Sequence, residues 1–270
     1  MIETRYVEIA SAPAGERPAR IAAHLSGRGP LAVLIHGFPL DHRLWLDVLH
    51  GPLAERRTLC AVDLRGHGWS PWRGDPVHTM ERFADDVRAV IRALGDEPAD
   101  VAGLSMGGYA AFALQARHPE LVRSLVLSNT RAAADGDAQR TARDDAIASV
   151  VEHGRRALVD AMLPKLLAPG ADPLRRAQVR TMIESLPVET IVADQRGLQR
   201  REDRVASLGA IAVPTLVVAG GADPITPVGE AEVMARGIPG ARLEVVPDTA
   251  HLTPLERPDA WSSAVATLWT

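Results

Sequence analysis

The fold of this chain is decided by residues 101 to 109, which read Val101-Ala102-Gly103-Leu104-Ser105-Met106-Gly107-Gly108-Tyr109. The segment begins as a short apolar strand, turns sharply and continues as a helix. Its centre matches Gly-x-Ser-x-Gly, in which a serine sits on a strained strand-to-helix turn and a side chain two residues away on either side would collide. The helix that follows points its N-terminal amides at the space above Ser105, where they can stabilise an anion. The alternative is an ordinary turn in which Ser105 only caps the helix.

Strands and helices alternate on both sides of this turn. Runs that are apolar on consecutive positions, as in strands buried on both faces, occur at 31–35, 58–62, 121–128 and 215–220. Between them, Met80 to Leu94 carries apolar residues at helical spacing. Residues 3 to 11 and 18 to 25 alternate weakly and predict an antiparallel hairpin. The chain is therefore predicted to be α/β, with a mostly parallel central sheet flanked by helices.

The alternation stops between residues 131 and 207. Charged helical segments follow one another there, over 144–167, 175–186 and 189–201, and prolines separate them. About 75 residues exceed one ordinary crossover connection. We therefore predict a helical insertion at 131–207, within a core domain made of residues 1–130 and 208–270.

Composition excludes several classes of protein. The 270 residues carry a formal net charge of −4, so nothing indicates a nucleic-acid partner or an anionic membrane. The single cysteine, Cys60, excludes an internal disulfide, and no Cys/His spacing resembles a zinc site. No signal peptide is visible and no apolar run approaches the roughly 20 residues of a membrane helix, so the expected location is cytoplasmic.

Two polar residues stand after later strands, in a chain order that suits a serine nucleophile. Asp223 closely follows the strand 215–220, and His251 follows the next one, leaving room for one helix and one strand between them. Ser105, Asp223 and His251 would then project from the carboxyl ends of parallel strands, where open α/β sheets place their sites.

Each residue type suits acyl transfer. His251 would remove the proton of Ser105 during attack and later protonate the leaving group, while Asp223 would hold the imidazole in the correct tautomer. The backbone amides of Phe38 and Met106 would form an oxyanion hole for the tetrahedral intermediate.

With these residues, the chain resembles the α/β-hydrolase superfamily over essentially its whole length. The matching segments are His36-Gly37-Phe38-Pro39, the loop from Asp63 to Ser70, the turn around Ser105, Gly221-Ala222-Asp223, and His251 with Pro254, Glu256 and Pro258. The resemblance implies that residues 131–207 form a mobile cap over the active site. Serine at 105 separates the chain from haloalkane dehalogenases and epoxide hydrolases, which carry aspartate there.

Other residues compete for parts in the site. Asp63 also ends a strand, but it precedes Ser105, and the resemblance gives its loop a structural role. Asp248 lies near His251 on the same loop, and Asn129 stands where some members place the acid, although an amide cannot stabilise an imidazolium as a carboxylate does. Asp223 is the preferred acid. His36 and His67 are expected to hold loop geometry.

The predicted activity is hydrolysis of a small-molecule carboxylic ester or lactone through an acyl-enzyme, with no metal and no organic cofactor. Alternatives on the same scaffold are a cofactor-free haloperoxidase or perhydrolase, a C–C bond hydrolase, and a ligand receptor that turns over slowly or not at all. The physiological substrate and the oligomeric state are open at this stage.

Overall fold

The computed structural model describes residues 1–9, 19–95 and 97–269. Within them the strands are β1 Glu3–Ile9, β2 Ala19–Gly27, β3 Leu31–Ile35, β4 Thr58–Val62, β5 Ala99–Leu104, β6 Val122–Ser128, β7 Thr215–Gly220 and β8 Arg242–Val246. The α-helices are α1 Leu46–Leu49, α2 Met80–Leu94, α3 Met106–Arg117, α4 Asp137–His153, α5 Arg155–Leu166, α6 Pro173–Ser185, α7 Val188–Gln199, α8 Val228–Gly237, α9 Thr253–Glu256 and α10 Pro258–Ala266. None of these helices combines the length and apolarity that a bilayer-crossing segment needs.

One sheet of eight strands organises the described residues, in the order β1-β2-β4-β3-β5-β6-β7-β8. β2 pairs antiparallel with β1 and β4, and every pair from β4 to β8 is parallel. The predicted α/β class with a mostly parallel sheet is confirmed. The order reverses at β3, which has β4 on one side and β5 on the other, and such a switch point marks where α/β sheets bind ligands.

The N-terminal hairpin is formed by β1 and β2, with Glu3 opposite Leu25 and Ile9 opposite Ala19. The predicted boundaries at residues 11 and 18 fall in 10–18, outside the described residues.

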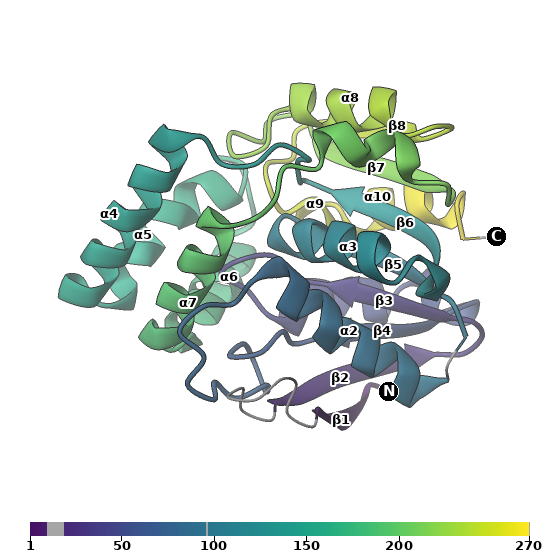
Figure 1. The fold of residues 1–270 in the computed structure, drawn as a ribbon, viewed down its shortest axis with the longest axis horizontal. Helices are drawn as coiled ribbons and strands as arrows, with labels where there is room; N and C mark the ends of the chain where they lie inside the picture. The colour runs from purple at the N-terminus through teal and green to yellow at the C-terminus, as the bar shows by residue number, and fades with distance from the viewer. Residues whose placement is uncertain (10–18, 96, 270) are drawn as a thin grey trace.

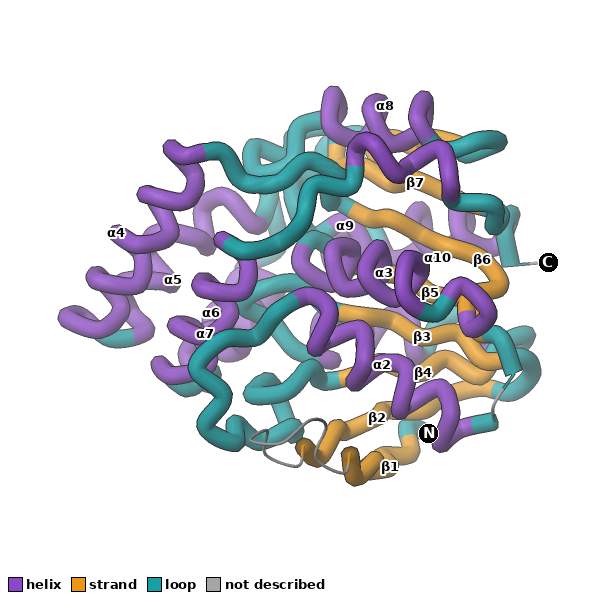
Figure 2. The backbone as a smooth tube through the Cα atoms, in the orientation of Figure 1, coloured by secondary structure: helices purple, strands orange, loops and turns teal. Residues whose placement is uncertain are grey.

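Helices cover both faces of the sheet. Figure 1 shows α2 and α3 in front of it and α9 and α10 behind it. α4 to α7 gather together at the left, beyond one end of the strands. Figure 2 shows the two loops that join this helical group to the core, one leading from β6 to α4 and one leaving α7. These two loops are bonded to each other, because the Arg204 amide donates to the Ala132 carbonyl at 2.9 Å.

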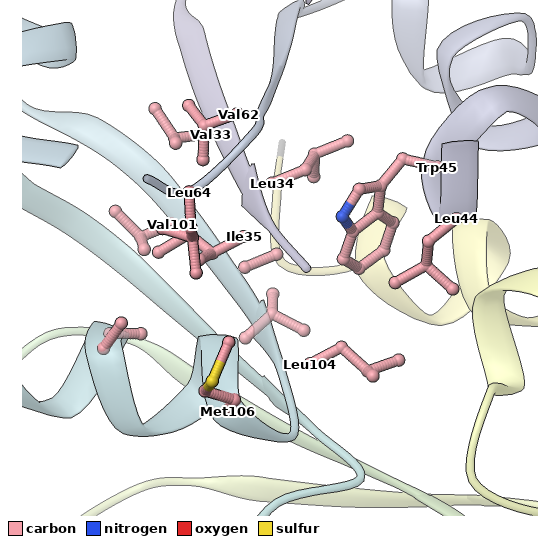
Figure 3. Packing of buried hydrophobic residues seen from close by; sticks show 14 of the residues in the cluster. Val33, Leu34, Ile35, Leu44, Trp45, Val62, Leu64, Val101, Leu104 and Met106 are labelled. Atoms are coloured by element: carbon pink, nitrogen blue, oxygen red, sulfur yellow. The ribbon is translucent and has the colours of Figure 1, made fainter. Parts of the chain in front are cut away.

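The apolar core anchors the turn that the sequence singles out. Figure 3 shows side chains of β3, β4 and β5 packed together with Leu104 and Met106, which flank Ser105 in sequence. Both are fully buried, at 0% and 1% exposure. Burying one such side chain contributes about 1.5–3 kcal/mol, whereas a strained backbone at one residue costs about 1–3 kcal/mol. Packing on both sides therefore holds the turn in place.

Two helical stretches of the sequence are divided in the structure. Residues 41–55 form the 3-10 helix His42–Trp45, then α1, then a second 3-10 helix Pro52–Glu55, because Gly51 is extended and Pro52 lacks an amide hydrogen. The predicted helix over 144–167 is split into α4 and α5 at Gly154, whose φ of 72° is left-handed.

Candidate active site

Ser105 lies on the turn between β5 and α3 with φ 54° and ψ −114°. A side chain at Gly103 would place its Cβ 2.2 Å from the carbonyl oxygen of Gly107, and one at Gly107 would lie 2.2 Å from that of Ile35. Real Cβ atoms do not approach backbone oxygens this closely, so both glycines are sterically required. These collisions are the steric reason for glycine that the Gly-x-Ser-x-Gly pattern predicts.

Residues from neighbouring strands hold this turn. The Ser105 amide donates to the carbonyl of Ser128 at 3.0 Å, and the Thr130 hydroxyl donates to the Ser105 carbonyl at 2.9 Å. The loop after β3 lies against the same residue, because a Cβ on Gly37 would be 3.0 Å from the Ser105 Cβ. Phe38, one of the two residues whose amides are predicted to bind an oxyanion, directly follows this contact.

Asp223 and His251 are hydrogen-bonded to each other. The Nδ1 atom of His251 lies 2.7 Å from Oδ2 of Asp223, and the exposures of the two residues are 1% and 5%. Because a carboxylate can only accept, the His251 proton is on Nδ1 and Nε2 carries the lone pair. This tautomer suits a base that acts through Nε2.

The environment of Asp223 keeps its carboxylate ionised. Burial would raise its pKa, but hydrogen bonds from His251, Thr226 and Asn129 and the charge of His251 outweigh burial and lower the pKa to about 2. The amides of Ile225 and Thr226 donate to its other oxygen at 2.8 and 3.1 Å. A charged acid facing Nδ1 would stabilise an imidazolium at His251.

The helical group reaches the His251 loop. The His251 amide donates to the carbonyl of Leu166, the last residue of α5, at 3.2 Å. Glu256 accepts from the amides of Ala250 and Ala168 at 2.9 and 2.8 Å, so one carboxylate joins the loop to the segment after α5. Burial raises the pKa of Glu256. The position of His251 therefore depends on α5.

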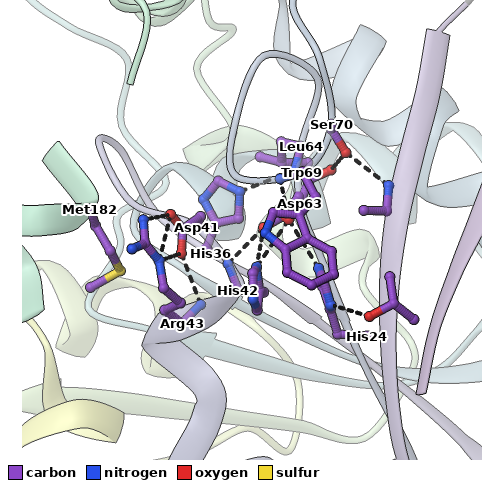
Figure 4. A network of polar contacts seen from close by, with 12 residues as sticks. His24, His36, Asp41, His42, Arg43, Asp63, Leu64, Trp69, Ser70 and Met182 are labelled. Atoms are coloured by element: carbon purple, nitrogen blue, oxygen red, sulfur yellow. Dashed lines mark hydrogen bonds and ion pairs between the residues drawn. The ribbon is translucent and has the colours of Figure 1, made fainter. Parts of the chain in front are cut away.

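Asp63 is engaged elsewhere and does not contact His251. Figure 4 shows it at the centre of a polar network, with His24 Nε2 and His42 Nδ1 at 3.0 and 2.9 Å and the Trp69 amide at 2.8 Å. Burial alone would raise its pKa, but the hydrogen bonds from His24 and His42 hold the pKa well below its usual range. The expected structural role of this loop agrees with these contacts.

His24, His42 and Asp63 are the one group of potential metal ligands found within the described residues. Their geometry suits hydrogen bonds better than a metal ion. His24 Nε2 and His42 Nδ1 both lie 3.0 Å from Oδ2 of Asp63, a hydrogen-bond distance, and the two imidazole rings stack at 3.6 Å with an interplanar angle of 20°.

Two other histidines bind backbone groups, as expected. His36 Nδ1 donates to the Gly37 carbonyl, and its Nε2 accepts from the Leu64 amide at 3.1 Å. Burial, followed by the nearby charge of His67, lowers the His36 pKa to about 4, so the ring is neutral. His67 Nδ1 donates to the carbonyl of Arg65 at 3.1 Å.

The His67 ring also contacts α7, which the sequence did not indicate. Its Nε2 lies 3.0 Å from Oδ2 of Asp194, an ion pair without a well-aligned hydrogen bond, and His78 Nδ1 lies 2.7 Å from Oδ1. Burial alone would lower the pKa of His67, but the negative charge of Asp194 is the main effect that outweighs burial, so the pKa of His67 is raised. No local pattern marks Asp194 as a partner of residues 116 and 127 positions earlier, so only the fold reveals this cluster.

The remaining candidates are exposed, lie in the core or contact Asp223. Asp248 is exposed and left-handed, with φ 57°. Cys60 is buried in β4, and burial raises the pKa of its thiol to about 12, which agrees with a core residue. Asn129 lies beside Asp223 and donates to it, as described below. Thr226, which the sequence pattern does not indicate, donates its hydroxyl to Asp223 Oδ2 at 2.6 Å.

Comparisons with known proteins identify the family of this chain. The family model described as alpha/beta hydrolase fold matches residues 30–258. A curated relative from Neisseria meningitidis, a pimeloyl-[acyl-carrier protein] methyl ester esterase, is 32% identical over 85% of this chain and 73% of its own length. A 3-oxoadipate enol-lactonase from Acinetobacter baylyi is 28% identical, over 85% of each chain.

A solved structure can be compared with this chain in fold as well as in sequence. A thermophilic esterase from Thermogutta terrifontis, determined with malate bound, superposes with a TM-score of 0.92 and 33% identity over 97% of both chains. The family match covers most of the chain, and the relatives are similar along nearly its whole length. The chain therefore belongs to the alpha/beta hydrolase family and is a hydrolase.

Proposed function

We propose that the protein hydrolyses a small-molecule carboxylic ester or lactone through an acyl-enzyme formed on Ser105. His251 is the general base and acid, Asp223 is the acid that orients it, and the amides of Phe38 and Met106 form the oxyanion hole. The observation that carries this proposal is the 2.7 Å hydrogen bond between Asp223 and His251, which follow strands at the same edge of the parallel sheet as the strained Ser105.

The reaction follows from these groups. Ser105 Oγ attacks the acyl carbon as its proton passes to His251 Nε2, and the carbonyl oxygen becomes an oxyanion at the two amides. Collapse of this intermediate breaks the acyl–oxygen bond, and His251 returns the proton to the leaving alcohol oxygen. A water then repeats the sequence on the acyl-enzyme, releasing the acid and restoring Ser105.

The names of the relatives support the substrate class. The Neisseria relative is named as a methyl ester esterase and the Acinetobacter relative as an enol-lactonase. Both reactions open an acyl–oxygen bond, so an ester or lactone is the substrate class that the two have in common. The proposed partner is a small molecule, and the proposed location is the cytoplasm, as expected from the sequence.

We also propose residues 131–207 as the cap, with 1–130 and 208–270 as the core. Residues 131–207 carry buried apolar side chains at Leu163, Leu166, Met182, Ile183 and Leu186, and Met162 is half-buried. An apolar cap favours substrates with longer acyl chains, because each buried methylene contributes about 0.8 kcal/mol at most. Two to four methylenes would favour butyrate-to-hexanoate esters over acetate by roughly one to two orders of magnitude.

Arginine anchors for an acidic substrate are less well supported. Six arginines of residues 131–207 could serve as such an anchor. Each of them contacts a protein group: Arg131 with Asp135, Arg155 with the Leu186 carbonyl, Arg156 with Asp160, Arg175 with Asp47, Arg176 with the Ala168 carbonyl and Arg180 with Glu184. A guanidinium already bound to a protein group has less to gain from a substrate carboxylate.

Labelling with a fluorophosphonate tests the nucleophile. Intact-mass analysis and peptide mapping should find one adduct, on Ser105, and none in Ser105→Ala. Ser207→Ala is the control, because Ser207 is exposed and bonds only to the local carbonyl of Arg204. Labelling that persists in Ser105→Ala would reject the assignment.

A substrate screen tests the reaction class. It should cover p-nitrophenyl esters from C2 to C8, a charged ester of matched size, lactones, C–C hydrolase substrates and peroxide-dependent oxidation. A flat neutral series together with preference for the anionic ester would reject the apolar pocket. Turnover only with peroxide, or only at a C–C bond, would replace ester hydrolysis with that activity, and binding without turnover would indicate a receptor.

A further inference from the structure

Asn129 occupies the end of β6, between the strand that carries Ser105 and the strand that leads to Asp223. It is 2% exposed, and its left-handed backbone, with φ 46°, is bonded through its amide to the Val218 carbonyl at 2.8 Å. Asparagine tolerates this conformation better than most residues. Its side chain is therefore held at the sheet end where the two strands meet the His251 loop.

The hydrogen bonds fix the orientation of this amide. Nδ2 donates to Asp223 Oδ2 at 3.0 Å and to the Ala250 carbonyl at 3.1 Å. Both partners can only accept, because the Asp223 carboxylate is ionised at neutral pH. Oδ1 accepts from the Thr253 hydroxyl at 2.6 Å. Both amide hydrogens are used, and reversing the amide would oppose acceptor to acceptor.

Three donors share one oxygen of Asp223. His251 Nδ1 lies 2.7 Å from Oδ2, the Thr226 hydroxyl 2.6 Å and the Asn129 Nδ2 atom 3.0 Å. Each hydrogen bond draws on the same negative charge, so the bond from Asn129 leaves less of that charge for the imidazole.

We propose that Asn129 is a positioning residue: its amide nitrogen ties the acid to the histidine loop and sets how much of the Asp223 charge reaches His251. The inference rests on the proposed function, because it gives Asp223 and His251 the parts of acid and base. It also explains why residue 129 is asparagine. An ionised aspartate could not donate a hydrogen bond to Asp223, and leucine could neither donate to Asp223 nor accept from Thr253.

Other ionisable groups around this pair must be kept constant in the test. Glu256 on α9 accepts from the Ala250 amide, and Arg176 on α6 donates to the Ala168 carbonyl at the same junction. Asp248 lies exposed on the His251 loop. A change at Asn129 leaves all three in place, so their titrations cancel in a comparison with the unmodified protein.

Asn129→Gly removes the amide without straining the left-handed backbone, because glycine adopts positive φ freely. We expect kcat to fall about 10- to 100-fold, because the acid is no longer tied to the His251 loop and the imidazole loses its orientation, with KM changed less than about two-fold. The acid limb of the kcat/KM profile should move to higher pH, because the carboxylate then stabilises the imidazolium more strongly. Asp248→Gly is the matched control, since it makes the same backbone change on the His251 loop.

The pH titration of the His251 ring, followed by NMR in histidine-labelled protein and assigned with His251→Gln, gives a readout that needs no turnover. It should shift upward in Asn129→Gly and stay in place in Asp248→Gly. A merely structural role would lower the melting temperature and leave both the acid limb and the ring titration unmoved, which would overturn the proposal.

If Asn129→Gly does not fold, Thr253→Val tests the same network by removing the donor that orients the amide. We expect a smaller fall in kcat, about two- to ten-fold, and the same upward shift of the acid limb. Unchanged values in this folded variant would also overturn the proposal. Absence of ester turnover and of Ser105 labelling in the unmodified protein would instead reject the proposed function, while the ring titration would still report on Asn129.

Discussion

Replacing Asp223 with asparagine keeps the side-chain shape and removes the charge, and the hydrogen bonds dictate how the new amide must sit. Oδ1 accepts from the backbone amides of Ile225 and Thr226, which can only donate. At the Oδ2 position, His251 can move its proton and the Thr226 hydroxyl can rotate, and only the bond from Asn129 is lost. The amide nitrogen is therefore expected at the Oδ2 position, where it points N–H groups at His251 Nδ1. His251 must then carry its proton on Nε2, the nitrogen that has to accept the proton of Ser105.

The wrong tautomer sets the size of the effect. We expect Asp223→Asn to lower kcat on the order of 10⁴-fold, which corresponds to about 5 kcal/mol of activation free energy. The free energy of unfolding should fall by less than the activation free energy rises. The pKa of Asp223 is about 2 in the folded protein, below its ordinary value of 3.8, so the carboxylate contributes stability above about pH 4 that is lost as the pH falls toward 2. At neutral pH the variant should lose about 2 kcal/mol and remain folded.

The assay is steady-state ester hydrolysis at 25 °C, with thermal unfolding followed in parallel. Asp248→Asn is the control, because Asp248 is exposed and asparagine tolerates its left-handed backbone. It should retain kcat within about two-fold. If Asp248→Asn were the damaging change, or if a folded Asp223→Asn kept most of its kcat, the choice of acid would be refuted.

Three further predictions concern the base, the turn and the link to α7. Log(kcat/KM) should rise through an acid limb that reflects His251 alone, since Asp223 stays ionised there, and a flat profile from pH 5 to 8 would contradict the base. Gly107→Ala should prevent folding or abolish Ser105 labelling, because its Cβ would lie 2.2 Å from a carbonyl oxygen, whereas Gly229→Ala, with open space around it, should be tolerated. Asp194→Leu should cost about 3–5 kcal/mol of unfolding free energy. Asp194→Asn should cost less. The unmodified protein has a part of its stability that is present below about pH 6.5 and is lost as the pH rises through the raised pKa of His67, and Asp194→Asn should lack this part. An identical pH dependence of unfolding in Asp194→Asn and the unmodified protein would speak against the ion pair.

The sequence by itself determined the features that arise from local sterics and from apolar spacing. Glycine at 103 and 107 is demanded by the turn at Ser105, and the consecutive apolar residues of β3, β4, β5 and β7 mark strands that are buried on both faces. The chain order of Ser105, Asp223 and His251 was readable because each follows a strand, and parallel strands bring their carboxyl ends to one edge.

The sequence predicts the boundary of a helix only where a residue that ends helices interrupts the apolar pattern. The pattern over 144–167 has helical spacing on both sides of Gly154, and a left-handed glycine inside a continuous pattern leaves no other signal.

Only the tertiary structure decided which polar side chains meet. Asn129 and Asp223 are 94 positions apart, and the amide donates to the carboxylate because β6 and β7 are neighbours in the sheet. Asp63 binds His24 and His42, which lie 39 and 21 positions earlier, and Asp194 binds His67 and His78, which lie 127 and 116 positions earlier. A hydrogen bond depends on distances of about 3 Å and on donor direction, and a one-dimensional pattern of residue types carries neither until the strands are paired.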